Sequence, residues 1–358
     1  MKTKAKFFFV LLIVIIQYKF AFSQSEVVNF LQGGIDDGQK LFKAYLSPYG
    51  NVLGADLNGG WFNTASTHKF PGFDITFTLS TSFVPASDKE FDINNISLTN
   101  LTLADSSAHI AQTIAGKDEE GPLLQYYKDF NGTPVKLGEF HTPKGTGWGF
   151  FPLPMIKASI GITHGFEIMG RYMPTYKKKA FSIGLWGIGL KHDILQYTPV
   201  AKKLPVLNVS VMAAYTRVKT TSKIDYQWTI YQAAGIQVNN DSTLYTNQNL
   251  EIICQGLSAN LLVSVNLPVL TLYGATGYSN SSTDINLTGD YPLVGMNVNT
   301  GSPEIVPCKD PLKISIDNFS GLQFTGGARL KFGILTFHAD YTYSDYSMIS
   351  TGLGVSFR

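Results

Sequence analysis

The stretch from Phe73 to Val84 reads Phe-Asp-Ile-Thr-Phe-Thr-Leu-Ser-Thr-Ser-Phe-Val and alternates apolar with polar residues in near-strict period two. This pattern predicts a β-strand with one apolar and one polar face. Its length matches the roughly 9 to 11 residues that a tilted strand needs to cross the hydrocarbon layer of a membrane. Leu207–Thr216 and Leu335–Tyr343 show the same alternation. We therefore expect membrane-spanning strands.

Tight turns join further candidate strands. Thr163–Gly165, Asn266–Pro268 and Lys331–Gly333 are too short for anything but hairpins, so the strands beside them pair antiparallel. A bilayer tolerates no unsatisfied strand edge, and this requirement favours an all-β, antiparallel transmembrane β-barrel over a soluble β-sandwich. The further candidate strands are Ile156–Ile162, Phe166–Met173, Phe181–Lys191, Gly256–Val265, Val269–Tyr278, Leu322–Lys331 and Met348–Phe357.

Successive strands cross the membrane in opposite directions, which constrains their number. When a weaker candidate at Ile93–Leu103 is counted, the directions disagree by one crossing, which predicts another strand between Ala104 and Leu153. The total is about 12 strands, or about 14 if Ile224–Ile230 pairs with Asp284–Thr288, because bacterial barrels have even numbers. If Arg358 lies in the periplasm, the three short turns are periplasmic too. The long segments Thr220–Asn249 and Ser279–Gly321 then lie outside the cell.

The N-terminus has the features of a signal peptide. Lys2, Lys4 and Lys6 precede the apolar run Phe7–Ile16, and small residues stand before Gln24. We expect residues 1–24 to be removed and the mature chain to reach the outer membrane of a Gram-negative cell. No cysteine lies near this junction to carry a lipid.

Residues 25–72 form a different kind of segment. From Ser25, apolar residues recur near helical spacing until Ser47-Pro48, which predicts one amphipathic helix. Asn51–Phe70 is rich in glycine and predicts an ordered loop. Two interpretations stay open for this segment: a plug inside the barrel, or a periplasmic helix that docks on a partner. The barrel itself is expected over residues 73–358.

Composition and the C-terminus agree with this destination. Charged residues are only 15% and aromatic residues 13%, and the net charge of +2 indicates no nucleic-acid partner. After Gln24 no apolar stretch is long enough for a membrane-spanning helix. The final segment, Thr351–Arg358, resembles the C-terminal signal by which the barrel-assembly machinery recognises such proteins, although Arg358 follows the aromatic Phe357. The expected partners are this machinery and outer-membrane lipid.

The two cysteines, Cys254 and Cys308, are both expected on the extracellular side. An oxidising compartment favours a disulfide between them that pins the Ser279–Gly321 loop. The alternative is two separate thiols.

Charged residues on the polar sides of strands are the candidate functional residues. Their side chains should face the lumen and line a pathway, or form an internal salt-bridge ladder that holds the barrel or its plug. The candidates are Glu167, Arg171, Arg329, His338 and Asp340.

Signs of catalysis are few. The sequence has no His-Glu-x-x-His, Gly-x-Ser-x-Gly or Cys-x-x-Cys motif, and its six histidines are scattered. His192-Asp193 beside Lys191 stands at a strand end, where polar groups are usually solvated. We expect no enzyme, metal or cofactor, with a barrel-borne hydrolase or acyltransferase as the minor alternative.

Several stretches resemble an uncharacterised outer-membrane family of unknown function, and the resemblance covers most of the mature chain. They are Asn58–Ala65 with His68-Lys69 and Gly72–Asp74, then Gly165–Pro174, and Ile183–Asp193. In architecture, an N-terminal plug-like segment before roughly fourteen strands is similar to the FadL-type transporters of long-chain fatty acids and other hydrophobic compounds. No ligand-binding residue of those transporters is carried over.

Two functions follow as hypotheses. The first is passive transport of small or hydrophobic molecules across the outer membrane. The second is a scaffolding barrel whose outer loops bind a partner or support adhesion. Larger barrels need a plug or hold a channel, so the expected size favours transport.

Overall fold

The computed structural model describes residues 27–130, 132–178, 180–199, 203–226, 244–296, 303–318 and 320–357. The predicted signal peptide, residues 1–24, lies outside the described residues.

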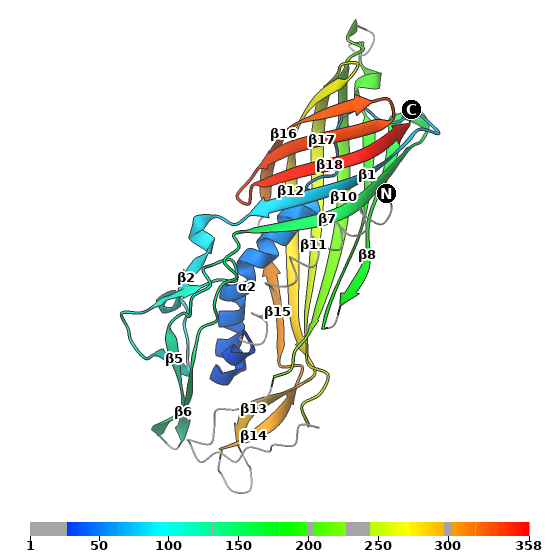
Figure 1. Cartoon of the computed structure of the whole chain (residues 1–358). Helices are drawn as coiled ribbons and strands as arrows, with labels where there is room; N and C mark the ends of the chain where they lie inside the picture. Colours follow the sequence, from blue (N-terminus) through cyan, green and yellow to red (C-terminus); the bar gives the residue numbers. More distant parts are fainter. Residues whose placement is uncertain are drawn as a thin grey trace.

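Ten strands form a closed antiparallel barrel (Figure 1). Each pairs with its neighbours in the chain, and β1 pairs with β18 from Phe73↔Phe357 to Ser82↔Met348, which closes the wall. The strands are β1 (Phe73–Phe83), β7 (Phe150–Gly161), β8 (Phe166–Lys178), β9 (Phe181–Asp193), β10 (Leu207–Lys223), β11 (Asn249–Asn266), β12 (Leu270–Thr288), β16 (Gly321–Phe332), β17 (Leu335–Tyr343) and β18 (Met348–Phe357).

The barrel is confirmed, but its strand number is ten and not the 12 to 14 expected. Residues 84–149 contribute no strand to the wall; they form small hairpins at one end of the barrel. Asp284–Thr288 is the end of β12 and pairs with β11, so it makes no separate strand. The two strands expected before Leu153, at Ile93–Leu103 and between Ala104 and Leu153, are both absent from the wall, so the number of strands stays even.

The period-two pattern places the side chains as predicted. Along β1, Asp74 and the alternating Thr and Ser residues are buried, whereas Phe73, Ile75 and Phe83 are exposed. The other strands repeat this arrangement, with exposed residues such as Ile188, Leu257 and Phe324 on the outer face. The result is the apolar belt that a transmembrane barrel presents to lipid.

The two ends of the barrel differ. The turns after β7, β11 and β16 are short and lie with Phe357 at one end, which we call the inner end. The opposite, outer end carries β2 (Glu90–Asp92), β3 (Leu101–Leu103), β4 (Ile110–Gln112), β5 (Leu123–Phe130), β6 (Thr133–His141), β13 (Asp290–Met296), β14 (Pro303–Lys309) and β15 (Leu312–Asp317). The short 3-10 helices η2 (Ala86–Asp88), η3 (Ile93–Asn95), η4 (Thr163–Gly165) and η5 (Leu195–Tyr197) lie in loops.

The N-terminal helix is longer than predicted. A short 3-10 helix, η1 (Val28–Gly33), ends at Gly34, whose φ of 89° breaks the chain direction before α2 (Ile35–Asn58). The prediction that the helix stops at Ser47-Pro48 was wrong. Apolar residues on both sides of Pro48 are buried, and this packing outweighs the lost backbone hydrogen bond. Among the described residues, no helix is both long and apolar enough to span a membrane.

The outer half of α2 forms an apolar core with the outer hairpins. Phe42 and Tyr45 pack on Phe30, and Phe30 packs on Phe140 of β6. The carboxylate of Asp37 accepts hydrogen bonds from the backbone N–H groups of residues 99–101 at 2.7 to 3.2 Å. The helix is therefore anchored to the hairpins at the outer end, while its C-terminal half lies inside the barrel.

Candidate functional site

The C-terminal half of α2 lies against the barrel wall. A Cβ added at Gly50 would come within 2.9 Å of Asn318 Oδ1 and 3.1 Å of Thr283 Oγ1, and one added at Gly54 would collide with Ser281. Only glycine permits this approach, because the wall leaves no room for a side chain. The C-terminal half of α2 therefore lies inside the barrel, packed closely against the wall.

Polar contacts also hold α2 to the wall. Ser82 Oγ donates to Asp56 Oδ1 at 2.7 Å, and Asn58 Nδ2 donates to the carbonyl of Asn280 at 3.3 Å. Other polar atoms at this interface have no hydrogen-bond partner in the described part of the chain, among them Asp56 Oδ2, Asn58 Oδ1 and Ser258 Oγ. The helix–wall interface is polar and incompletely bonded.

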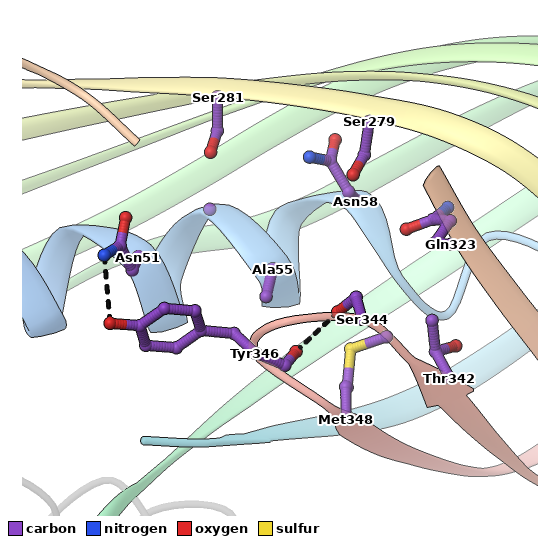
Figure 2. Close-up of a pocket in the computed structure, with 11 residues that line it drawn as sticks. Asn51, Ala55, Asn58, Ser279, Ser281, Gln323, Thr342, Ser344, Tyr346 and Met348 are labelled. Carbon is purple, nitrogen blue, oxygen red and sulfur yellow. Dashed lines mark hydrogen bonds between the residues drawn. The ribbon is translucent and has the colours of Figure 1, made fainter. Parts of the chain in front are cut away.

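A narrow cavity runs beside α2, with room for about one water molecule. Figure 2 shows Asn51, Ala55 and Asn58 of α2 facing side chains of β12, β16 and the β17–β18 turn. At its outer end, Asn51 Nδ2 donates to Tyr346 Oη at 3.0 Å, and Tyr346 in turn donates to Asp88. Burial raises the pKa of Tyr346 above its usual range, so the phenol stays protonated and keeps donating.

The C-terminus of α2 is held by a cation. Arg171 Nη1 donates to the carbonyl of Leu57 at 2.9 Å, Nη2 donates to the carbonyl of Gly59, and the guanidinium lies 3.9 Å above the ring of Trp61. Thr216 Oγ1 also donates to Leu57. A positive charge at this position satisfies the last carbonyls and complements the helix dipole.

After α2, residues 59–72 run along the lumen toward the inner end; we call this segment the strap. The backbone N–H and Nδ1 of His68 both contact Glu167 Oε2, at 2.9 and 2.8 Å. Lys191 Nζ lies 3.0 Å from Glu167 Oε1 and donates to the carbonyl of Ser66 at 3.1 Å. Lys157 Nζ lies 3.6 Å from Asp74 of the wall and donates to the carbonyl of Trp61 in the strap at 3.3 Å. These buried charges tie the strap to the wall.

The C-terminal strands bring the other predicted residues to the same interior. Asp340 accepts a hydrogen bond from Tyr273 Oη at 2.8 Å, and Tyr273 packs edge-on against Phe62 of the strap. Arg329 and His338 are cross-strand neighbours on β16 and β17, and both are buried. Neither ring nitrogen of His338 has a hydrogen-bond partner among the described residues.

The five predicted residues are thus all buried on the inner side, but they form separate contacts. Glu167 and Arg171 hold the strap and the helix, whereas Arg329, His338 and Asp340 lie on strands β16 and β17. Sequence reasoning missed the partners His68, Lys157 and Lys191. The alternation along their strands predicts that Lys157 and Lys191 face inward. His68 lies in an irregular segment that has no such pattern.

The predicted disulfide is wrong, because both cysteines are free thiols. Cys254 points into the barrel and packs beside Gly50 and Asn318. Cys308 belongs to the hairpin of β13 and β14, opposite Tyr291. His192, beside the buried Lys191, stacks on Phe166. Within the described ranges, no group of three His, Cys, Asp or Glu side chains could hold a metal ion.

Solved structures with a similar fold are outer-membrane barrels. The translocator domain of the autotransporter NalP from Neisseria meningitidis shares 10% identity over 81% of this chain and 90% of its own, with a TM-score of 0.30. OprG from Pseudomonas aeruginosa shares 10% identity over 83% of this chain and 100% of its own, with a TM-score of 0.29. Ail, the attachment invasion locus protein of Yersinia pestis, shares 8% over 80% and 100%, with a TM-score of 0.25.

These likenesses concern the fold alone. No curated protein matches the chain. One family, described as a family of unknown function (DUF6588), matches residues 1–357.

Proposed function

The chain therefore belongs to this family of unknown function, and from the geometry of its barrel we propose that it transports small or hydrophobic molecules passively across the outer membrane. The fold is that of an outer-membrane barrel, and α2 with the strap forms a plug in its lumen. In this proposal, transport requires the plug to move.

The observation that carries the proposal is the polar wall around the plug. A permanently filled core would be expected to use interlocking apolar side chains. Instead, much of the wall beside the C-terminal half of α2 carries hydroxyl and amide groups, which water would solvate once the helix moved. These residues include Thr78, Ser80, Ser82, Ser258, Asn260, Ser281, Thr283, Thr342 and Ser350.

The energetics of the interface support a movable plug. A buried polar atom without a partner costs about 1 to 3 kcal/mol. Asp56 Oδ2, Asn58 Oδ1 and Ser258 Oγ carry this cost in the plugged state and would regain hydrogen bonds from water when α2 shifts. The helix is fixed instead at its two ends, by Asp37 in the outer hairpins and by Arg171 in the lumen.

A reversible lock tests the proposal. Asp56→Cys with Ser82→Cys, in a chain whose own cysteines are replaced by alanine, would tether α2 to β1. The matched control is Thr325→Cys with Thr342→Cys, because these hydroxyls lie 2.9 Å apart on two strands of the wall and a bridge between them does not tether the helix. The measurements are conductance in planar bilayers and swelling of liposomes in arabinose, together with uptake of the apolar dye N-phenylnaphthylamine by cells.

We expect transport to disappear when the helix–wall pair is oxidised and to return on reduction, while the control pair leaves it unchanged. Equal transport in the locked and reduced forms would refute a gating plug. An absence of transport of every probe in all forms would favour the scaffolding barrel, whose outer hairpins then become the functional surface.

A further inference from the structure

The neighbouring strands β8, β9 and β10 carry a groove of about 300 Å³ in the outer half of the barrel wall. Its floor is β9, where the residues Ser182 and Gly184 are small. Their neighbour one step inward along the same face, Trp186, is large and exposed. The wall is therefore recessed directly outward of an aromatic side chain.

An irregularity in β8 shapes one side of this groove. Met173 pairs with Leu185 and Tyr176 pairs with Ile183, so β8 gains one residue relative to β9, as in a β-bulge. A Cβ added at Gly184 would lie 2.7 Å from Thr175 Oγ1 in this irregular stretch. The absence of a side chain at Gly184 thus keeps the floor open.

Cations form the opposite side of the groove. Arg217 and Lys219 of β10 both line it, and they pair across the strands with Trp186 and Gly184 of β9. Both belong to the same face of β10 as the exposed Val211, because positions of the same parity share a face of a strand. The two cations are therefore directed away from the lumen.

The outer segments of all three strands are basic. Residues 172–178, 181–186 and 215–223 contain no Asp or Glu. Their cations are Lys177, Lys178, Arg217, Lys219 and Lys223. Glu251 of the next strand, β11, lies 2.5 Å from Lys219 and balances one of these charges. The positive charges that remain repel one another and favour an anionic partner.

Arg217 also has a hydrogen-bond donor to spare. Its Nε is buried and has no hydrogen-bond partner among the residues that the structure describes. A buried donor without a partner is destabilising, and a bound anion would remove that cost. The guanidinium group presents its donors in a fixed fork that matches the oxygens of a phosphate group, so phosphate is the anion that this site suits best.

The groove lies at the height of lipid headgroups. Inward of it, the same three strands expose Ile168, Ile188 and Val211, which form part of the apolar belt. Tyr172 and Trp186, which pair with each other, are exposed at the boundary, as the aromatic residues of a membrane interface are. A lipid whose headgroup lay in the groove would have its acyl chains on the apolar belt.

We propose that the groove binds the phosphorylated sugar headgroup of a lipid in the outer leaflet, with phosphate oxygens held by Arg217 and Lys219. The groove is larger than a phosphate group alone requires, and the hydroxyl groups of Thr175, Ser182 and Thr221 line it as partners for a sugar. No residue of α2 or the strap lines the groove, so this site goes beyond transport and does not depend on it.

Binding of a defined lipid to the refolded mature protein tests the site. The probes are lipid A with two phosphates, the same lipid after removal of both phosphates, and inorganic phosphate, each titrated in non-ionic detergent and followed by native mass spectrometry. The groove variant is Arg217→Gln with Lys219→Gln. The matched control is Lys136→Gln with Lys313→Gln, which also removes two exposed cations, one of them from an ion pair, but away from the groove.

We expect the groove variant to bind phosphorylated lipid A about 30-fold more weakly than the wild type, because each Lys or Arg near a lipid headgroup contributes about fivefold in affinity. The control should bind like the wild type, and the wild type should bind the dephosphorylated lipid about as weakly as the variant binds the phosphorylated one. Equal affinity of the groove variant and the wild type would overturn the site. An equal loss in the control would overturn it too, because overall surface charge would then account for binding.

A second variant tests the groove without removing its charges. Ser182→Phe fills the floor, and Thr276→Phe makes the same change at an exposed position of β12. A heat-modifiability gel confirms that each variant has folded. We expect only Ser182→Phe to lose lipid A, and undiminished binding by it would overturn the placement of the headgroup in the groove. Inorganic phosphate that displaces the lipid completely at equimolar concentration would overturn the lipid as the occupant and indicate a site for the free anion.

Discussion

The guanidinium of Arg171 donates to the carbonyl of Leu57 over 2.9 Å, across 114 residues of sequence, and so fixes the end of the plug helix to the wall. We predict that Arg171→Ala lowers the free energy of unfolding by about 2 to 3 kcal/mol, because two carbonyls lose a charged donor. It should also raise conductance in planar bilayers. Arg217→Ala, on the lipid-facing side of β10, is the control. Weaker stability with unaltered conductance would instead support a purely structural ladder.

A second prediction concerns Gly54, whose missing side chain makes room for Ser281. Gly54→Ala should destabilise the barrel by about 1 to 3 kcal/mol, because the new methyl group overlaps the serine side chain. Gly326→Ala should cost much less, since nothing lies within 4 Å of its added Cβ. Adding Ser281→Gly to the first variant should recover stability in urea titrations. A failure of this rescue would show that the helix does not press on β12.

The strap predicts energetic coupling between His68 and Glu167. A double-mutant cycle with His68→Ala and Glu167→Gln should give a coupling free energy of about 1 to 3 kcal/mol, since the pair is buried and shares Lys191. The exposed pair Lys136 and Glu139 is the comparison, and solvent should leave its coupling negligible. Additive effects at His68 and Glu167 would mean that the strap is not held by this contact.

The free thiols should differ in reactivity. Maleimide should label Cys308 in the folded protein and reach Cys254 only after unfolding, because Cys254 is fully buried. Burial raises the pKa of the Cys308 thiol, which lowers its thiolate fraction at neutral pH, so labelling should accelerate as the pH rises. Mass spectrometry after labelling counts the modified residues. A mass measured without reductant that shows no free thiols would contradict the structure. Rapid labelling of Cys254 in the native protein would contradict it too.

The barrel was predictable because one physical rule governs each wall strand. Lipid on one face and a polar lumen on the other impose period two, and burial alternates along the whole of Phe73–Phe83. The strand number was not predictable in the same way. Leu123–Phe130 and Thr133–His141 are true strands, yet they pair with each other beyond the membrane, and local pattern does not distinguish the two settings.

The candidate site was predictable only in part. Parity along the strands indicated that Glu167 and Arg171 face inward, and they do. Their partners come from the irregular strap, where His68 and Trp61 are placed by tertiary contacts that no periodicity records. The continuation of α2 through Pro48 was not predicted for a related reason. Contacts with the surrounding wall and hairpins, and not local propensity, keep the helix continuous.

The path of the N-terminal segment also constrains how the protein is built. Its helix begins among the outer hairpins, and the strap ends at the inner end, where β1 starts. The segment that precedes the first strand in the chain therefore runs through the barrel. Phe73 and Phe357 meet only when the wall closes. The closed barrel therefore surrounds a segment that precedes its first strand in the chain, and the pairing of the first strand with the last completes the wall around that segment.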